Sequence, residues 1–201
     1  MDFIYIVSDR KLAKDRFFEI IKNVVEEGYS FIQLRENDLS AIELTNIIEK
    51  LHEITKGKIK LVINDRVDVA KIYSLYGVQL KKTSLSPTLV KKYFSDLKIG
   101  VSCHDEKRVK EYDNVADFFV YGNVFETSCK PGLEGKGLEK LRAIVSLTKK
   151  PVFAIGGITP ENVIMIKKTG AYGVAVRSLV FGNKNYLEYL EKIRNLWSKN
   201  E

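Results

Sequence analysis

The segment Lys60-Leu61-Val62-Ile63-Asn64-Asp65-Arg66 joins a short apolar run to three polar residues. A short run that is nearly continuous in apolar residues is typical of a strand buried on both faces of a parallel sheet. Polar residues that directly follow such a strand lie at its carboxyl end, where α/β proteins build their binding sites. The same combination recurs along the chain, so this segment predicts the fold as well as one part of a site.

Seven other apolar runs of this kind alternate with longer amphipathic segments. The eight predicted strands are Phe3–Val7, Phe31–Leu34, Lys60–Ile63, Gly77–Leu80, Ile99–Val101, Phe118–Val124, Val152–Ile155 and Gly173–Val176. Between the first two, Phe17, Ile20, Ile21 and Val24 have the spacing of one helix face. Another helix is expected to begin at Thr159-Pro160-Glu161. Eight strands alternating with eight helical segments predict one α/β domain over residues 1–201, a (β/α)₈ TIM barrel.

An open doubly wound sheet is the alternative fold, and the polar residues at the strand ends argue against it. In a barrel these ends converge on one mouth, whereas an open sheet does not bring all eight together. The polar ends are Ser8-Asp9-Arg10, Arg35-Glu36-Asn37, Asn64-Asp65-Arg66, Ser102-Cys103-His104, the stretch 123–130, Gly156-Gly157 and Arg177-Ser178.

The composition excludes several classes of protein. With 45% hydrophobic and 29% charged residues among 201, the chain is globular and not intrinsically disordered. Two cysteines, Cys103 and Cys129, are too few for a disulfide scaffold or a structural zinc site. Without a basic leader or an apolar run of about 20 residues, we expect a cytoplasmic protein with no membrane partner.

The net charge of +7 suits an anionic partner such as a phosphorylated metabolite, although it is also compatible with an ordinary solvated surface. There is no helix-turn-helix spacing, no set of zinc ligands and no arginine-rich arm in the sequence. We therefore expect no binding to nucleic acid.

Several strand ends carry residues suited to binding anions. Gly156-Gly157 lets backbone amides approach a phosphate, and Arg177 and Ser178 add donors after the next strand, although the glycines alone would also form a tight turn. Arg35 is predicted either to point into the mouth or to form a salt bridge with Glu36 or Asp65.

The remaining strand ends supply acid–base groups and a long loop. His104 is a candidate acid or base, whereas Cys103 alternates to the other face of its strand. A lone Asp65 is a poor metal site and is expected to cap a helix or pair with Arg66. The glycines and the Thr-Ser-Cys-Lys cluster of the loop 126–137 favour an anion-binding lid over a plain solvated loop.

Taken together and in order, these motifs resemble the thiamine phosphate synthase/TenI superfamily along nearly the whole chain. They are Val7-Ser8-Asp9-Arg10, Gln33-Leu34-Arg35-Glu36, Ile63-Asn64-Asp65-Arg66-Val67-Asp68, Gly77-Val78-Gln79-Leu80, Gly100-Val101-Ser102 with His104, the stretch 122–130, and Ala154-Ile155-Gly156-Gly157-Ile158.

The resemblance implies one of two enzymatic activities. A synthase joins an aminopyrimidine pyrophosphate to a thiazole phosphate with Mg²⁺, and its pattern differs here at Asn37, where a lysine is usual, and at Ser84, where a second metal carboxylate is usual. The TenI branch instead aromatises a thiazole phosphate carboxylate by proton transfer, without a cofactor. The stretch 124–135 resembles that branch, although Asn123 stands where its histidine is expected. On these grounds we expect a thiazole tautomerase, an isomerase.

The resemblance also implies roles for individual residues. The synthase pattern places the pyrophosphate on Arg35, Asn64, Ser102 and Lys130, and the thiazole phosphate on Gly157, Arg177 and Ser178. For the tautomerase, the expected catalytic residues are Glu126, His104 and Lys130, and the expected substrate-binding residues are Gln33, Arg35, Asn64, Ser102, Asn123, Thr127, Gly157, Arg177 and Ser178.

Two other functions stay open, as does the assembly. The synthase is the first alternative, and Mg²⁺ is expected only if it holds. A regulator that binds a ligand without turning it over is the second. The expected partner is a phosphorylated thiazole in each enzymatic interpretation. The oligomeric state is open, a homodimer included.

Overall fold

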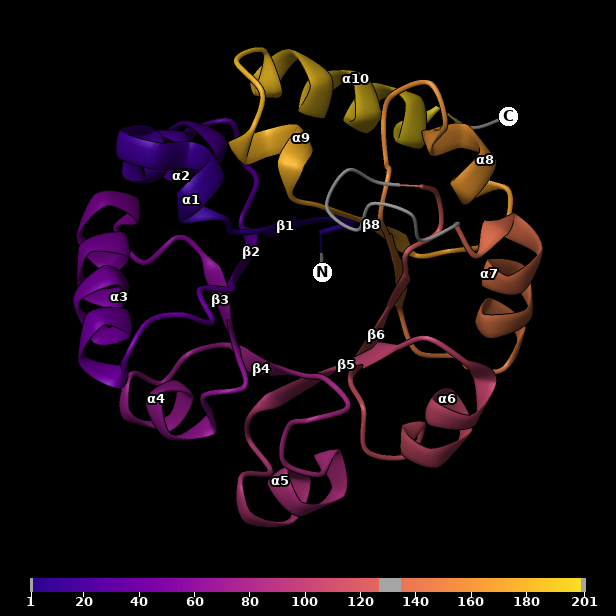
Figure 1. The fold of residues 1–201 in the computed structure, drawn as a ribbon, viewed down its shortest axis with the longest axis horizontal. Helices are drawn as coiled ribbons and strands as arrows, with labels where there is room; N and C mark the ends of the chain where they lie inside the picture. The colour runs from indigo at the N-terminus through magenta and orange to yellow at the C-terminus, as the bar shows by residue number, and fades with distance from the viewer. Residues whose placement is uncertain (1, 127–134, 200–201) are drawn as a thin grey trace.

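Eight parallel strands close into a barrel in the computed structural model, which describes residues 2–126 and 135–199 (Figure 1). Their bounds are β1 Ile4–Val7, β2 Phe31–Leu34, β3 Lys60–Asn64, β4 Gly77–Leu80, β5 Lys98–Cys103, β6 Phe118–Gly122, β7 Val152–Ile155 and β8 Gly173–Val176. Closure comes from pairing of β1 with β8, where Ile4 lies opposite Val174. The predicted (β/α)₈ barrel is confirmed.

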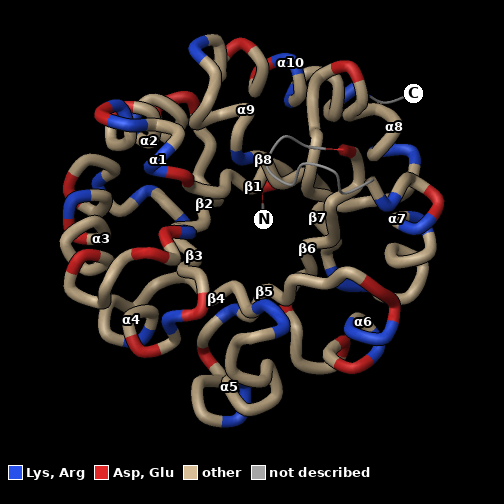
Figure 2. The backbone as a smooth tube through the Cα atoms, viewed as in Figure 1, with Lys and Arg blue, Asp and Glu red and all other residues tan. Residues whose placement is uncertain are grey.

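The helices form an outer ring around the strands (Figure 1). In chain order they are α1 Arg10–Ala13, the 3₁₀ turn η1 Lys14–Arg16, α2 Phe17–Glu26, α3 Ala41–Thr55, α4 Val67–Ile72, α5 Pro87–Tyr93, α6 Glu106–Tyr112, α7 Gly137–Ser146, α8 Val163–Lys167, α9 Ser178–Phe181 and α10 Tyr186–Ser198. Lysine, arginine and the acidic residues lie largely on this ring and its loops (Figure 2). None of the described helices is long and apolar enough to cross a membrane.

Several element boundaries differ from the sequence prediction. Strand β1 begins one residue later, β3 ends one residue later, and β5 is longer at both ends. Two further differences have a cause that the structure shows. Strand β6 ends at Gly122 instead of Val124, because its pairing with β7 ends where Gly122 lies opposite Ile155. Helix α8 begins at Val163 and not at Thr159, because Asn162 holds a turn there. The Asn162 side chain accepts a hydrogen bond from the Thr159 N–H at 2.9 Å and donates one to the Gly157 carbonyl at 2.7 Å.

A cluster of aromatic rings fills the lower part of the barrel. Tyr5, Phe31, Phe118 and Phe153 are fully buried, and the Tyr5 and Phe31 rings stack with centroids 4.2 Å apart. Phe118 meets Phe31 edge-on at 5.5 Å. Gly100 makes room for this cluster, since a Cβ there would lie 2.4 Å from the Phe118 ring. These four rings form an aromatic plug, which closes one end of the barrel and leaves open the end at which the strands have their carboxyl termini.

A second core lies between the strands and the helical ring. The predicted face of α2 is entirely buried, from Phe17 to Val24. Helix α10 buries Tyr186, Leu190 and Ile193, and Trp197 near its end stacks on Phe3 with centroids 5.6 Å apart. This packing locks the last helix against the start of the first strand.

Phe118→Ala is expected to lower the free energy of unfolding by about 3–5 kcal/mol, because it removes a fully buried ring from the plug and leaves a cavity. Tyr93→Ala is the matched control, since Tyr93 is 65% exposed and its loss should change stability by less than about 0.5 kcal/mol. Urea denaturation of both variants measures the difference. Equal destabilisation of the two would contradict a plugged barrel.

Candidate active site

A cavity of about 670 Å³ opens at the carboxyl ends of the strands. Ten residues predicted from the sequence line it: Gln33, Arg35, Asn64, Ser102, His104, Asn123, Glu126, Gly157, Arg177 and Ser178. They come from six strand ends, so closure of the barrel brings them together. Thr127 and Lys130, which were also predicted, lie outside the described residues, and so do Cys129 and most of the expected lid.

A belt of amides and hydroxyls crosses the cavity floor from β2 to β5. The Gln33 amide donates to the Asn64 oxygen at 3.3 Å, and the Asn64 amide donates to Asn37 at 2.9 Å. On the next pair of strands, Gln79 donates to the Ser102 hydroxyl at 2.9 Å. These side chains position one another and cover the apolar plug with hydrogen-bonding groups.

A buried carboxylate ties the ends of β1 and β2 together. Glu36 accepts hydrogen bonds from the Ser8 hydroxyl at 2.5 Å and from the Arg10 N–H at 3.1 Å. The Ser8 hydroxyl oxygen in turn accepts the Arg35 N–H at 2.9 Å. Burial raises the pKa of Glu36, and the hydrogen bonds from Ser8 and Arg10 oppose that shift. These hydrogen bonds fix the backbone at Arg35, whose side chain extends into the cavity.

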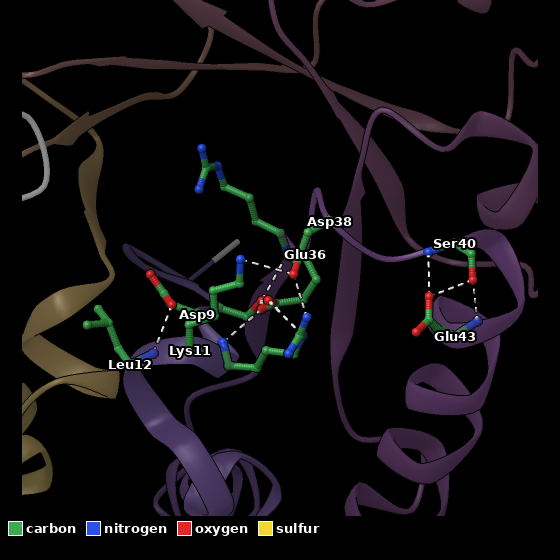
Figure 3. A network of polar contacts seen from close by, with 10 residues as sticks. Asp9, Lys11, Leu12, Glu36, Asp38, Ser40 and Glu43 are labelled. Atoms are coloured by element: carbon green, nitrogen blue, oxygen red, sulfur yellow. Dashed lines mark hydrogen bonds and ion pairs between the residues drawn. The ribbon is translucent and has the colours of Figure 1, made fainter.

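The start of α1 is held by charge as well (Figure 3). Asp38 lies 2.5 Å from the Arg10 guanidinium and 3.1 Å from the Lys11 ammonium. Asp9 caps the helix by accepting the Leu12 N–H at 3.1 Å. Arg10 and Lys11 therefore face Asp38 at the outer rim, and the cations of the cavity come from other positions.

The turn after β7 has room only for glycine. Gly156 and Gly157 have φ values of +104° and +65°, in the left-handed region that other residues disfavour. A Cβ on Gly157 would lie 2.4 Å from the Glu126 carbonyl, and one on Gly156 would lie 2.6 Å from the Asn123 side chain. The two glycines thus pack this turn against the segment after β6 at the cavity wall.

Arg177 and Ser178 follow β8 and lie beside this glycine turn in the cavity lining. The Arg177 Nε is 3.7 Å from Asp9 Oδ2, which keeps the guanidinium at the rim. A glycine turn after strand 7 and a short helix after strand 8 are the usual phosphate-binding elements of this fold, and α9 supplies that helix here.

His104 and Cys103 have separate environments, as their alternation along β5 predicts. The His104 Nδ1–H donates to the Gly122 carbonyl at 2.6 Å, and the Lys136 ammonium donates to the His104 carbonyl at 2.6 Å. Cys103 is fully buried, and burial raises the pKa of its thiol to about 12. Cys103 is therefore no nucleophile near neutral pH.

Asp65 follows β3 and contacts Lys81 and Ser84. Lys81 Nζ lies 2.7 Å from Asp65 Oδ2, and the Ser84 hydroxyl donates to Asp65 Oδ1. The predicted pair with Arg66 is wrong, because the Arg66 guanidinium binds Asp68 with Nη2 and Oδ2 2.5 Å apart.

Arg35 enters the cavity, as one of its two predicted alternatives has it. The other alternative was a salt bridge to Glu36 or Asp65. Those carboxylates bind the Ser8 hydroxyl and the Lys81 ammonium, respectively.

Sequence reasoning missed the apolar part of the cavity lining and five of its polar side chains: Gln79, Lys81, Thr159, Asn183 and Tyr189. Lys81 directly follows β4 and obeys the strand-end rule that identified the other residues, so the signal was present. Thr159 lies two residues after the glycine pair. Asn183 and Tyr189 come from the segment after the last strand, where strand periodicity carries no information.

These residues define a (β/α)₈ barrel whose cavity carries anion-binding groups at separate strand ends. Arg35 and Lys81 follow β2 and β4, whereas Arg177, Ser178 and the glycine turn follow β7 and β8. In a closed ring of eight, β4 and β8 lie across the barrel from each other, so Lys81 and Arg177 lie on opposite sides, whereas β2, which precedes Arg35, is two strands from β8. Such a site suits a ligand or a pair of ligands with two separate phosphate groups.

The chain belongs to the thiamine monophosphate synthase/TenI family, whose sequence model matches residues 4–180. It is 34% identical over 86% of its length to a putative thiamine-phosphate synthase 2 of Aquifex aeolicus, 94% of which is covered. A thiamine-phosphate synthase of Clostridium tetani is 33% identical, with 98% of this chain and 96% of that one covered.

A solved thiamine phosphate pyrophosphorylase from Pyrococcus furiosus has the same fold, with a TM-score of 0.86 and 32% identity. The match covers 96% of this chain and 94% of that one. A 3-hexulose-6-phosphate synthase matches with a TM-score of 0.70 at 14% identity, which shows the fold alone.

These relatives correct the predicted activity. The sequence favoured a TenI-type thiazole tautomerase, an isomerase, and that prediction is wrong. Relatives at 30–34% identity over most of the chain are thiamine-phosphate synthases by name, and so is the similar solved structure under its equivalent name. The differences at Asn37 and Ser84 therefore do not indicate the tautomerase branch.

The residues around Asp65 do not fit the Mg²⁺ ion that a synthase implies. Mg²⁺ requires oxygen ligands in near-octahedral geometry. Asp65 instead has an ammonium on one oxygen and a hydroxyl donor on the other. Within residues 2–126 and 135–199, no three His, Cys, Asp or Glu side chains form a group that could hold a metal ion.

In the wild type, the free energy of unfolding should fall as pH rises, because Glu36 loses its proton. Glu36→Gln is expected to abolish this part of the pH dependence. A raised pKa in the folded state means that this state holds the proton more tightly than the unfolded state. The stabilisation is present below the ordinary glutamate pKa of 4.5 and is lost as pH rises through the folded value. Glutamine keeps an acceptor for Ser8 and Arg10 but does not titrate.

Glu43→Gln is the control with the opposite sign. The Ser40 hydroxyl lowers the pKa of Glu43, so its contribution is present at neutral pH and is lost on acidification. Denaturant unfolding between pH 3.5 and 7, a range that extends about one unit below and about two and a half units above the ordinary glutamate pKa, measures both effects. Parallel pH profiles for wild type and Glu36→Gln would contradict the assignment.

Proposed function

We propose that this protein is a thiamine-phosphate synthase, a transferase that joins an aminopyrimidine pyrophosphate to a thiazole phosphate and releases pyrophosphate. One observation carries the proposal: a single cavity has cationic groups at two opposite strand ends. The two substrates each carry a phosphate group, and both must be present at once for the bond between them to form. The names of the relatives support the same activity.

The reaction moves one carbon from oxygen to nitrogen. The thiazole nitrogen forms a bond to the exocyclic methylene carbon of the pyrimidine, and the bond from that carbon to the pyrophosphate oxygen breaks. The electron pair of that bond leaves with the pyrophosphate. The chain must therefore align the two rings and stabilise the negative charge that gathers on the leaving group.

In this proposal, each side of the cavity binds one substrate. Arg35 and Lys81 bind the pyrophosphate, and the Asn64 and Ser102 side chains extend that side along the belt. Arg177, Ser178 and the amides of the Gly156-Gly157 turn bind the thiazole phosphate. The amide of Gln33 and the Asn123 side chain lie between the two sides and face the rings.

The direct test supplies both substrates to the purified protein. We expect formation of thiamine phosphate, followed by fluorescence after oxidation to the thiochrome, with release of one equivalent of pyrophosphate. Omission of either substrate should abolish both signals. Failure to form product under conditions in which both substrates bind would refute the transferase.

Ser178→Asp is expected to raise KM for the thiazole phosphate at least about tenfold, equivalent to about 1.4 kcal/mol, because it places a carboxylate against the phosphate. KM for the pyrimidine substrate should change little, since that substrate lies across the barrel. Ser178→Ala is the control, since it keeps the backbone amide and adds no charge. Steady-state kinetics with each substrate varied in turn gives both constants, and a rise in the pyrimidine KM alone would reverse the assignment of the two sides.

A further inference from the structure

The contacts around Asp65 form a clamp that holds a lysine at the cavity. Lys81 Nζ lies 2.7 Å from Asp65 Oδ2, and the Asn64 amide donates to the same oxygen at 2.9 Å. The Ser84 hydroxyl donates to the other oxygen, Oδ1. Asp65 thus binds one ammonium and two neutral donors, and both of its oxygens are used within the protein.

The backbone of this region keeps the clamp in place. Asp65 has a φ of +63°, a left-handed conformation that aspartate tolerates better than most residues. Its N–H donates to the Gln79 carbonyl at 3.1 Å, which joins the end of β3 to β4. The Ser84 hydroxyl oxygen accepts the Lys81 N–H at 2.7 Å, so one serine holds both Lys81 and Asp65.

Charge around the clamp favours an anion over a metal cation. A metal ion on Asp65 would lie beside the Lys81 ammonium, and two cations within about 4 Å repel each other strongly at a partly buried site. Lys81 must leave for such an ion to bind. The Lys81 side chain is 42% exposed and lines the cavity, so its ammonium is accessible to a ligand that binds there. An ammonium has three N–H groups, and the Asp65 contact uses one.

We propose that Lys81 is the resident cation of the pyrophosphate site, held by Asp65 and Ser84 in the place of a divalent metal. The chain then binds pyrophosphate without Mg²⁺. This inference rests on the proposed synthase activity for its substrate, and the residues that carry it are those of the clamp. Arg35, which lines the same cavity, is the second positive charge of the site.

The proposed role follows from the charge balance of the reaction. When the bond from carbon to the pyrophosphate oxygen breaks, its electron pair adds one negative charge to the leaving group. The Lys81 ammonium donates hydrogen bonds to that group and keeps its own protons, so no base or oxidant is needed. The new bond from the thiazole nitrogen to carbon completes the exchange, and Asp65 keeps the ammonium in position throughout.

Titration calorimetry with inorganic pyrophosphate tests the site without turnover. We expect saturable binding by the wild type in buffer with EDTA. Lys81→Met should weaken that binding about tenfold or more, because it removes a charge-assisted contact. Lys82→Met is the matched control, since Lys82 is the exposed neighbour of Lys81 and is absent from the cavity lining, and its affinity should equal that of the wild type. Lys81→Arg should retain most of the affinity and guards against a folding defect.

Two results would overturn the proposal. The first is binding of pyrophosphate by the wild type only when Mg²⁺ is present. The second is equal affinity of the Lys81→Met and Lys82→Met proteins. Either result leaves the synthase proposal intact, because product formation is measured separately. Conversely, pyrophosphate binding that depends on Lys81, without formation of thiamine phosphate, would refute the synthase and leave a metal-free pyrophosphate site.

A double variant tests the same idea by restoring a metal site. Lys81→Met with Ser84→Asp removes the ammonium and sets a second carboxylate beside Asp65. We expect this variant to bind Mg²⁺ alone in calorimetry, whereas the wild type does not. Mg²⁺ binding by the wild type with an affinity equal to that of the double variant would contradict the assignment of Lys81.

Discussion

The aromatic plug inside the closed barrel is the constraint on which the site depends. Tyr5, Phe31, Phe118 and Phe153 fill the lower interior without exposed area. Because these rings supply the buried apolar area inside the barrel, the inward-facing residues above them can be polar without a large cost in stability. Gln33 and Gln79 form hydrogen bonds directly above the plug, as buried amides must. The barrel thus separates an apolar end, which provides stability, from a polar end, which can bind ligands.

Ion pairs at the rim hold the cations of the cavity before a ligand arrives. Lys81 lies against Asp65, and Arg177 lies near Asp9. The carboxylate beside each of these two cations fixes its position and reduces the rearrangement that binding requires. Each carboxylate also offsets part of the charge that attracts the phosphate. We infer that a fixed position of the cationic groups matters more here than the largest possible positive charge. A fixed position suits a reaction that depends on the alignment of two substrates.

The fold could be predicted because strands buried on both faces leave a strong pattern. β2, β4, β7 and β8 have the predicted bounds, and the strand-end rule located ten residues of the cavity lining. The start of α8 could not be predicted, since the side chain of Asn162 bonds back to Gly157 and replaces the expected first turn. Tyr189 reaches the cavity from α10, an outer helix, and only the packing of that helix places it there.

The error in the predicted activity has a physical cause that Lys81 makes clear. Ser84 stands where a synthase usually has a second metal carboxylate, and from the sequence alone this difference favours the tautomerase. The same segment contains a lysine whose ammonium lies on the remaining carboxylate, Asp65. A change that disfavours a metal need not disfavour a pyrophosphate, because the ligand requires positive charge and hydrogen-bond donors, and an ammonium supplies both. Substitutions at a charged site must therefore be judged together, since the charge that one position loses can be supplied by another.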